Sequence, residues 1–162
     1  MKHVNKNRLL LVEDDVILTL AESKILVDSG YEVRCVASGE DAIEVIKNDN
    51  GIDLILMDID LGSGINGLEA SRQILKIKDL PIVFLTSCID KKIIHQMKFI
   101  TRYGYIVKGS GEKTLLSSIE MAIGLFQSRK TIEAGEARYH QFTGNIVEVI
   151  RISDLRNKRK KI

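Results

Sequence analysis

Five short segments with strand-like composition, each followed by a stretch in which apolar residues recur with helical spacing, constrain the fold of this chain more than any other feature. Four of them are apolar, and in residues 32–37 polar and apolar residues alternate, as in a strand nearer the sheet edge. Each segment has four to six residues and ends at polar or turn residues. Such segments are typical of strands in a parallel sheet, with the helical stretches as crossovers. We predict strands at residues 8–12, 32–37, 53–57, 81–86 and 104–107, and helices at residues 16–27, 40–47, 66–78, 90–100 and 112 to about 127.

Five such units predict an α/β fold, in which a doubly wound five-stranded parallel sheet has helices on both faces. The flavodoxin-like strand order 2-1-3-4-5 suits this number of units. The chain has 162 residues, enough for this domain and an extension. We expect the domain at residues 1–128, and a helical, basic extension at residues 129–162 that is a linker or the truncated start of another domain.

Polar residues lie at the carboxyl ends of four predicted strands. Ligands bind at this edge of a doubly wound sheet, so these side chains are expected to lie together. Clustered carboxylates repel one another unless a cation joins them, and Mg²⁺ prefers oxygen ligands of this kind. A carboxylate can also attack a phosphoryl group, while the cation, a lysine and a threonine stabilise the phosphoryl oxygens. In chain order the residues are Glu13, Asp14, Asp58, Thr86 and Lys108.

Each of these residues, taken alone, has an ordinary explanation. Asp14 or Asp15 would cap the helix that begins near residue 16. Thr86 would be a plain strand residue, and Lys108 a solvated lysine. Their joint occurrence at the ends of successive strands favours a functional site.

Four segments resemble the successive motifs of CheY-like response-regulator receiver domains, and the resemblance extends over about residues 7–127. The resemblance implies a protein of a two-component phosphorelay, with Mg²⁺ as cofactor and a sensor histidine kinase or phosphotransfer protein as partner. Phosphorylation would switch a partner surface or a homodimer surface. The protein would catalyse its own phosphorylation and dephosphorylation without being a turnover enzyme. The segments are LLLVEDD (9–15), DLILMDIDLGSGINGLEA (53–70), PIVFLTS (81–87) and GYIVKG (104–109).

The same resemblance implies an acceptor and a set of metal ligands. Asp58 is the phosphoacceptor and also contacts the metal. Glu13 and Asp14 form the acidic pair that holds Mg²⁺, with Asp14 the more direct ligand. Asp60 contributes its backbone carbonyl.

The remaining roles concern the phosphoryl group and the switch. Thr86 is expected to bond the phosphoryl group and relay its presence, and Lys108 to pair with a phosphoryl oxygen. Tyr105 is the aromatic switch residue, unless it is a plain core or surface tyrosine. The chain departs from the family pattern twice, because the acceptor loop lacks Met-Pro and is one residue longer before Gly67, and because Gly109 replaces a cis proline. Since non-proline residues disfavour the cis bond, we expect the loop after Lys108 to have a different shape.

Two alternative functions are compatible with the sequence. A Mg²⁺-dependent aspartyl phosphatase-like enzyme would use Asp58 as nucleophile and Asp60 as acid and base, and sustained turnover of small phosphate esters would favour it. A DNA-binding regulator would use the basic run RNKRKK (156–161), and salt-sensitive DNA binding lost on deleting residues 151–162 would support it. Such a run is usually a solvated end, so nucleic acid is not an expected partner.

The basic excess of the chain lies in the extension. Residues 129–162 carry nine Lys and Arg against four Asp and Glu, a net charge of +5, whereas residues 1–128 carry 15 against 18, a net charge of −3. Within the extension, residues 135–150 resemble the lead-in to a PAS sensor domain, although a full PAS domain does not fit in the residues left.

The sequence also indicates where the protein is located in the cell and whether its cysteines are oxidised. No apolar run approaches the ~20 residues that span a bilayer, and the polar residues 1–8 do not begin a signal peptide. We therefore expect a cytoplasmic protein without membrane contact. Cys35 and Cys88 lie far apart in apolar runs, so we expect buried, reduced thiols and neither a zinc site nor a disulfide.

Overall fold

The structure, a computed structural model, describes residues 6–160, with side chains for residues 6–141 and for residue 143. Strands and helices alternate along the whole of this range. The strands are β1 (Arg8–Val12), β2 (Glu32–Val36), β3 (Leu54–Asp58), β4 (Ile82–Thr86) and β5 (Tyr105–Val107), and the helices are α1 (Val16–Asp28), α2 (Gly39–Asn48), α3 (Gly67–Ile77), α4 (Lys91–Ile100) and α5 (Glu112–Lys160).

The five strands form one parallel sheet in the order β2-β1-β3-β4-β5. This order confirms the predicted doubly wound fold. Because all five strands run in the same direction, their carboxyl ends share one edge of the sheet. The change in strand order between β1 and β3 marks the place on that edge where doubly wound proteins bind ligands.

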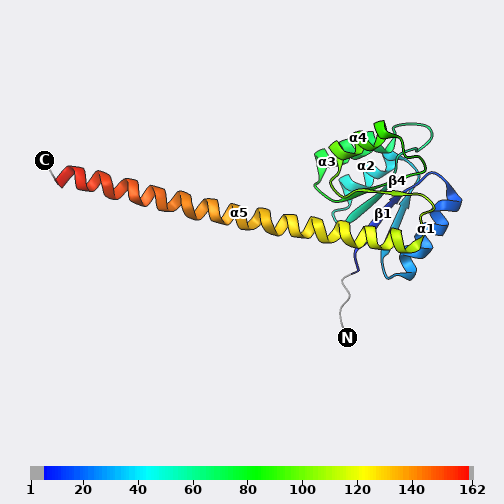
Figure 1. The fold of residues 1–162 in the computed structure, drawn as a ribbon, viewed down its shortest axis with the longest axis horizontal. Helices are drawn as coiled ribbons and strands as arrows, with labels where there is room; N and C mark the ends of the chain where they lie inside the picture. Colours follow the sequence, from blue (N-terminus) through cyan, green and yellow to red (C-terminus); the bar gives the residue numbers. More distant parts are fainter. Residues whose placement is uncertain (1–5, 161–162) are drawn as a thin grey trace. The chain divides into compact units, whose positions relative to one another are not determined.

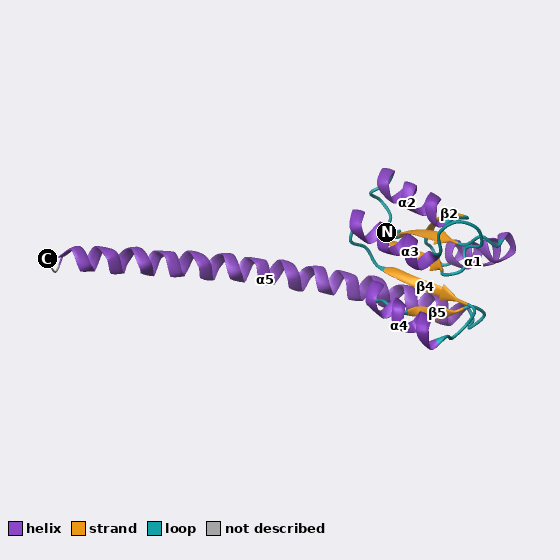
Figure 2. Cartoon of the chain, turned by 90° about the horizontal axis from the view of Figure 1, so that it is seen from above, coloured by secondary structure: helices purple, strands orange, loops and turns teal. Residues whose placement is uncertain are grey.

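Successive side chains of a strand point to opposite faces of the sheet, so the buried strands supply two cores. On one face Ile55 and Met57 of β3 pack with buried residues of α2, α3 and α4. On the other face Leu54 and Leu56 pack with α1 and with the part of α5 around Ile119. The two helix layers are visible on either side of the strands in Figure 1, and Figure 2 shows the same elements from above. A strand buried on both faces needs the nearly continuous apolar sequence seen here.

Capping residues account for the later start of two helices. Asp15, Ser38, Asn66 and Asp90 each accept a backbone N–H from the first turn of the helix that follows. The helices predicted to include Asn66 and Asp90 therefore begin one residue later. Every strand agrees with its predicted bounds to within one residue at each end.

Helix α5 continues far beyond the end of the predicted domain. A helix to about residue 127 and a helical extension were expected, and α5 runs to Lys160. The chain divides into two compact units, one ending at Phe126 and one beginning at Gln127. The PAS-like residues 135–150 lie within α5.

Two predictions at the chain ends reach past the described range. The expected absence of a signal peptide concerns the first residues of the chain, and residues 1–5 lie outside this range. The basic run ends at residue 161, and residues 161–162 also lie outside it. Within residues 6–160, no helix combines the length and hydropathy of a transmembrane segment.

Two expectations about burial were wrong. Cys35 and Cys88 are free thiols, but both are exposed. Cys35 lies on the edge strand β2, and Cys88 lies in the loop after β4, where the sheet no longer covers it. The apolar residues of α1 do not all face the core, because Ile17 and Leu20 are 77% and 66% exposed, whereas Leu26 of the same helix is buried.

Candidate functional site

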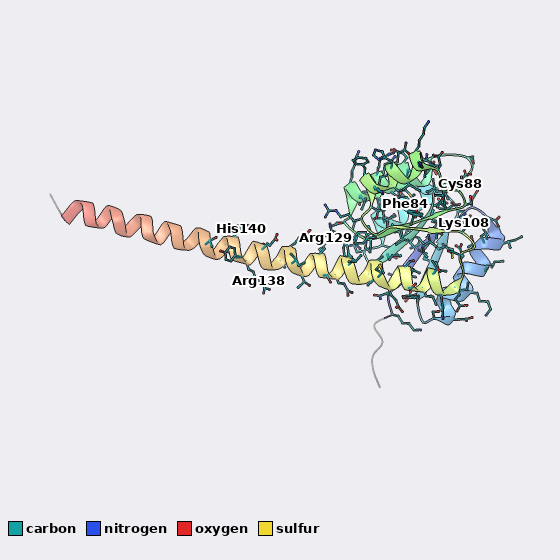
Figure 3. The ribbon with its side chains drawn as sticks, viewed as in Figure 1. Phe84, Cys88, Lys108, Arg129, Arg138 and His140 are labelled. Atoms are coloured by element: carbon teal, nitrogen blue, oxygen red, sulfur yellow. The ribbon has the colours of Figure 1, made fainter. Side chains whose placement is uncertain are left out.

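The strand order brings the polar ends of β1, β3, β4 and β5 to one edge of the sheet. β1 and β3 are neighbours with Val12 opposite Met57, so the residues that follow, Glu13 and Asp58, lie side by side. β5 lies next to β4 in the sheet, and Lys108, which follows β5, lies at the same edge (Figure 3). Residues far apart in the sequence are thereby brought together.

Lys108 forms ion pairs with two of these carboxylates. Its Nζ lies 2.7 Å from Oε2 of Glu13 and 3.0 Å from Oδ2 of Asp58. The side chains of Lys108, Glu13 and Asp58 are only 15%, 1% and 4% exposed. Water therefore solvates these charges poorly, and they depend on one another for stabilisation.

The buried charges change the pKa values of their neighbours. Burial raises the pKa of Asp58 to about 6, with Lys108 lowering it and Glu13 raising it. Burial lowers the pKa of Lys108, but its contacts with Glu13 and Asp58 outweigh this, so that its pKa is raised overall. At neutral pH the lysine is therefore an ammonium and Asp58 is mostly a carboxylate, the form that acts as a nucleophile.

Three carboxylates at this edge could hold a metal ion. Glu13, Asp14 and Asp58 each offer an oxygen, and these oxygens lie within 4.8 Å of one another. Lys108 balances only one of the three negative charges, so a divalent cation would relieve the remaining repulsion. Two buried oxygens and an exposed one suit Mg²⁺, which keeps several of its waters. Asp60, the fourth predicted ligand, donates its backbone N–H to Oδ1 of Asp58 at 3.2 Å, and the role of its carbonyl stays a prediction.

The glycine-rich loop between β3 and α3 is held against the domain by α2. Glu40 of α2 accepts the backbone N–H of Ile65 at 2.9 Å, and this bond lowers the pKa of Glu40. Gly64 has a φ of +92°, and a Cβ there would press on the Glu40 carboxylate. At Gly67, the first residue of α3, a Cβ would collide with the carbonyl oxygen of Asp58. The start of α3 therefore touches the backbone of the predicted phosphoacceptor.

The two predicted switch residues lie on β4 and β5. Thr86 is buried, and its Oγ1 donates to the carbonyl oxygen of Cys88 at 2.7 Å and accepts the N–H of Cys88 at 3.2 Å. Tyr105 stands opposite Phe84 in the sheet, and its side chain is partly exposed, at 39%. The hydroxyl of Thr86 is thus bonded to its own loop, and the ring of Tyr105 partly faces solvent.

The loop after Lys108 turns on glycines in the left-handed region. Gly109 and Gly111 have φ of +82° and +101°, values that side chains other than glycine rarely adopt. Ser110 closes the turn by donating its N–H to the carbonyl oxygen of Val107 at 3.2 Å. The described residues contain no cis peptide bond. A glycine turn thus stands where the family pattern has a cis proline.

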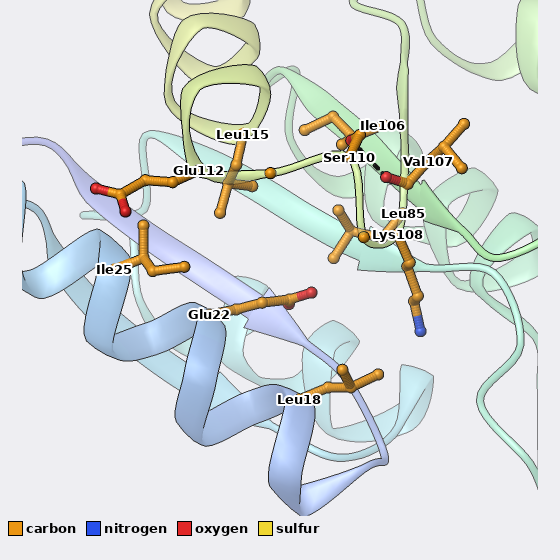
Figure 4. Close-up of a pocket in the computed structure, with 12 residues that line it drawn as sticks. Leu18, Glu22, Ile25, Leu85, Ile106, Val107, Lys108, Ser110, Glu112 and Leu115 are labelled. Carbon is orange, nitrogen blue, oxygen red and sulfur yellow. Dashed lines mark hydrogen bonds between the residues drawn. The ribbon is translucent and has the colours of Figure 1, made fainter.

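Glu22 of α1 is a fourth carboxylate near the site that sequence reasoning missed. Its Oε2 atom is buried without a hydrogen-bond partner. Together with Leu18, Ile25 and Lys108 it lines a pocket of about 190 Å³ between α1 and the loop after β5 (Figure 4). Burial raises the pKa of Glu22 to about 7, and repulsion by Glu13 adds to the effect. The sequence did contain one sign of this position, because Glu22 has helical spacing with the apolar residues Leu18 and Ile25 and therefore lies on the same face of α1.

We expect Glu22→Gln to stabilise the protein at pH 8 and to have little effect at pH 4.5. The pKa of Glu22 is about 7 in the folded state and about 4.5 when unperturbed, so between these values the folded state holds a proton that the unfolded state has lost. Stability therefore falls as the pH rises through this window. Because solvent reaches part of the side chain, we expect a gain of about 1 kcal/mol at pH 8. Urea denaturation in EDTA at both pH values measures it, and an equal gain at both would contradict this titration.

Comparison with known proteins agrees with this fold. Residues 9–120 match the family described as the response regulator receiver domain. The match covers more than half of the chain, which therefore belongs to the response regulator receiver family.

Individual relatives are similar over the same region. The transcriptional regulatory protein PdtaR of Mycobacterium tuberculosis is 26% identical over 127 residues, which are 78% of this chain and 61% of PdtaR. The chain thus matches less than two thirds of that relative. The N-terminal domain of a response regulator/sensory box/GGDEF 3-domain protein from Carboxydothermus hydrogenoformans is 35% identical, with a TM-score of 0.71 over 76% of this chain and 98% of that chain.

One solved relative contains a metal. The receiver domain of the sensor histidine kinase PA1611 from Pseudomonas aeruginosa has a magnesium ion coordinated in its active site cleft. It is 26% identical to this chain, with a TM-score of 0.67 over 74% of this chain and 98% of that chain.

Proposed function

We propose that the chain accepts a phosphoryl group on Asp58 from a sensor histidine kinase or a phosphotransfer protein. The observation that carries this proposal is the buried Asp58 carboxylate, which lies 3.0 Å from the Lys108 ammonium and within metal-binding reach of two further carboxylates. In the transfer, an Asp58 oxygen attacks the phosphorus atom. The O–P bond forms as the N–P bond of the phosphohistidine breaks, and the imidazole leaves with the electron pair.

The residues around Asp58 would assist this step by charge and position. Glu13, Asp14, Asp58 and the backbone carbonyl of Asp60 would hold Mg²⁺, which neutralises charge on the phosphoryl oxygens when bound. The magnesium ion of the PA1611 receiver supports this cofactor. Lys108 already places its ammonium 3.0 Å from Asp58, so it would pair with a phosphoryl oxygen on that residue.

Phosphorylation would be relayed through Thr86 and Tyr105. The Thr86 hydroxyl would exchange its bond with the Cys88 carbonyl for one with a phosphoryl oxygen. The ring of Tyr105, now 39% exposed, would then turn inward. This change would bias a two-state equilibrium and alter the surface of residues 88–125, which would meet a partner or a second copy.

The surface of α1 supports a protein as the phosphodonor. Val16, Ile17 and Leu20 are 70%, 77% and 66% exposed, and they follow directly after the acidic residues of the site. Exposed apolar side chains grouped beside a polar site are typical of a protein-binding surface. We further propose that residues 1–128 act as the receiver and residues 129–162 as its extension, and that the protein is not a turnover enzyme.

We expect one phosphoryl group to be added when the protein is incubated with acetyl phosphate and Mg²⁺. Intact-mass spectrometry measures the addition directly. Asp58→Asn should abolish it, because the amide is not a nucleophile. Asp28→Asn is a matched control, because Asp28 is an exposed residue at the end of α1 that pairs with Lys24 in the same helix, and it should be labelled normally.

Other outcomes would count against this function. Labelling of Asp58→Asn would place the acceptor elsewhere. Steady release of phosphate from small phosphate esters, without a protein adduct, would favour the aspartyl phosphatase-like alternative. Absence of both the adduct and phosphate release, with Mg²⁺ binding intact, would mean that the fold no longer signals by phosphorylation.

A further inference from the structure

We propose that the pocket beside Glu22 binds a small organic cation, with an ammonium or amidinium group on a compact apolar body. The pocket has a volume of about 190 Å³ and lies between α1 and the loop that joins β5 to α5. The charged group of the ligand bonds the Glu22 carboxylate, and its apolar body contacts the walls. Phosphoryl transfer to Asp58 requires neither Glu22 nor an occupied pocket, so this proposal goes beyond that function.

The carboxylate of Glu22 gives the pocket an acceptor that the protein itself does not use. Its Oε2 atom is buried and has no hydrogen-bond partner among the described residues. A buried polar atom without a partner costs free energy, and the cost is larger when the group is charged. Figure 4 shows the side chain extending from α1 toward the loop after β5. A donor carried by a ligand therefore finds an acceptor already in place.

The donors that line the same pocket are engaged elsewhere. The Nζ atom of Lys108 lies 2.7 Å from Oε2 of Glu13 and 3.0 Å from Oδ2 of Asp58, which hold the ammonium at the edge of the sheet. The hydroxyl of Ser110 donates to the carbonyl oxygen of Val107 at 2.6 Å. The pocket thus offers an acceptor to a ligand, and a matching ligand must supply the donor.

The charges around the pocket favour a cation over an anion. Burial and repulsion by Glu13 raise the pKa of Glu22 to about 7, and attraction by Lys108 only partly offsets them. Asp58 adds to the repulsion, and Glu112 brings a further carboxylate to the lining. One ammonium among these carboxylates leaves the region negative, which attracts a cation and repels an anion. A bound cation also favours the ionised form of Glu22.

The walls of the pocket favour an organic cation over a metal ion. A divalent metal ion carries a shell of about six oxygen ligands, waters included. Aliphatic side chains cannot bond those waters, and a single carboxylate cannot replace the shell. An ammonium group on an apolar body suits both parts of the site, because it bonds the carboxylate and covers apolar surface. The aliphatic lining consists of Leu18, Ile25, Leu85, Ile106, Val107 and Leu115.

The volume of the pocket limits the size of the ligand. At ~30 Å³ for each water molecule, about 190 Å³ corresponds to roughly six waters, which is the size of one small ring or a short branched chain. The loop after Lys108 adds little bulk, because Gly109 and Gly111 have no side chains and a Cβ at either would meet nothing within 4 Å. The glycine turn therefore leaves the space beside α1 open to a small molecule.

The test titrates the full chain with cyclohexylammonium and with cyclohexanol at pH 8, in saturating Mg²⁺, and follows two-dimensional ¹H–¹⁵N NMR spectra. The two probes share a ring and a number of non-hydrogen atoms, but only the first is charged. Cyclohexylammonium should shift the backbone signals of residues 109–111 with a Kd on the order of 1 mM. Cyclohexanol should bind at least about tenfold more weakly, because it lacks the charge-assisted bond.

Glu22→Gln keeps the shape of the side chain and removes its charge. This variant should bind cyclohexylammonium at least about tenfold more weakly than the wild type and bind cyclohexanol equally well. Glu44→Gln is the matched control, because it makes the same substitution at an exposed residue of α2, whose buried residues pack in the core on the other face of the sheet. The control should bind both probes like the wild type.

Four results would overturn the proposal. Cyclohexanol that binds as tightly as cyclohexylammonium would show that charge does not contribute. Equal binding by Glu22→Gln and the wild type would remove the carboxylate from the site. Shifts at Asp14 and Asp60 in place of residues 109–111 would put the cation at the acidic edge of the sheet. Unchanged spectra at amine concentrations many times the expected Kd would show that the pocket takes no organic cation.

Discussion

Gly67→Ala is expected to destabilise the protein by about 3 kcal/mol and to abolish labelling of Asp58 by acetyl phosphate. The added methyl group would collide with the backbone carbonyl oxygen of Asp58. A backbone atom in a buried strand cannot swing aside as a flexible side chain would. The N–H of Gly67 also donates to the carbonyl oxygen of Ile59 at 2.8 Å, which holds the start of α3 against the end of β3. Relief of the clash would therefore move Asp58, the proposed acceptor.

Gly124→Ala is the matched control for this substitution. Gly124 lies inside α5, and a Cβ there meets nothing within 4 Å. Because alanine is the better helix former, we expect a gain of about 0.5–1 kcal/mol and normal labelling. Urea denaturation and intact mass measure both effects. A Gly67→Ala variant as stable and as well labelled as the wild type would show that α3 does not constrain Asp58.

Lys108→Ala is expected to destabilise the protein by about 2 kcal/mol at pH 8 in EDTA. Removal of the ammonium leaves Glu13 and Asp58 as two buried carboxylates without their shared counter-charge, and the loss of one partner from a buried ion pair is costly. The defect should shrink as the pH falls towards 4. Without the lysine, the pKa of Asp58 lies further above its unfolded value than in the wild type, so the variant loses stability as the pH rises through that window.

The matched control is Lys24→Ala. Lys24 pairs with Asp28 at 2.8 Å on the exposed surface of α1, and such exposed pairs contribute little to stability. Saturating Mg²⁺ should recover part of the stability lost in Lys108→Ala, because a divalent cation replaces the missing positive charge. Urea titrations with and without Mg²⁺ measure this. Equal destabilisation by the two lysine variants at pH 8 would contradict the account of the buried charges.

The strands and most helix ends could be predicted because local chemistry determines them. A strand such as Leu54–Asp58 is buried on both faces and must be apolar almost throughout. Asp15 and Asn66 are good N-caps, so they mark the start of a helix in the sequence. The approximate position of the site was also predictable, since the carboxyl ends of parallel strands meet at one edge of the sheet.

The errors arose where the neighbours of a side chain lie elsewhere in the sequence. Apolar spacing in α1 did not reveal that Ile17 and Leu20 face solvent, because the packing of the helix on the sheet selects its buried face. Cys35 appeared buried in its apolar run, but its strand lies at the edge of the sheet. Glu22 attracted no attention, because its buried position depends on α1 and the loop after Lys108 lying together.

The sequence by itself determined the alternation of strands and helices, the parallel sheet, and the set of polar residues at its edge, because these follow from periodicity, capping and chain direction. Only the tertiary structure decided how those residues interact. It brought Lys108 between Glu13 and Asp58, bonded Thr86 to Cys88, and left Ile17 and Leu20 of α1 in solvent. Distances between side chains and access to water depend on how the elements pack, and sequence spacing does not contain that information.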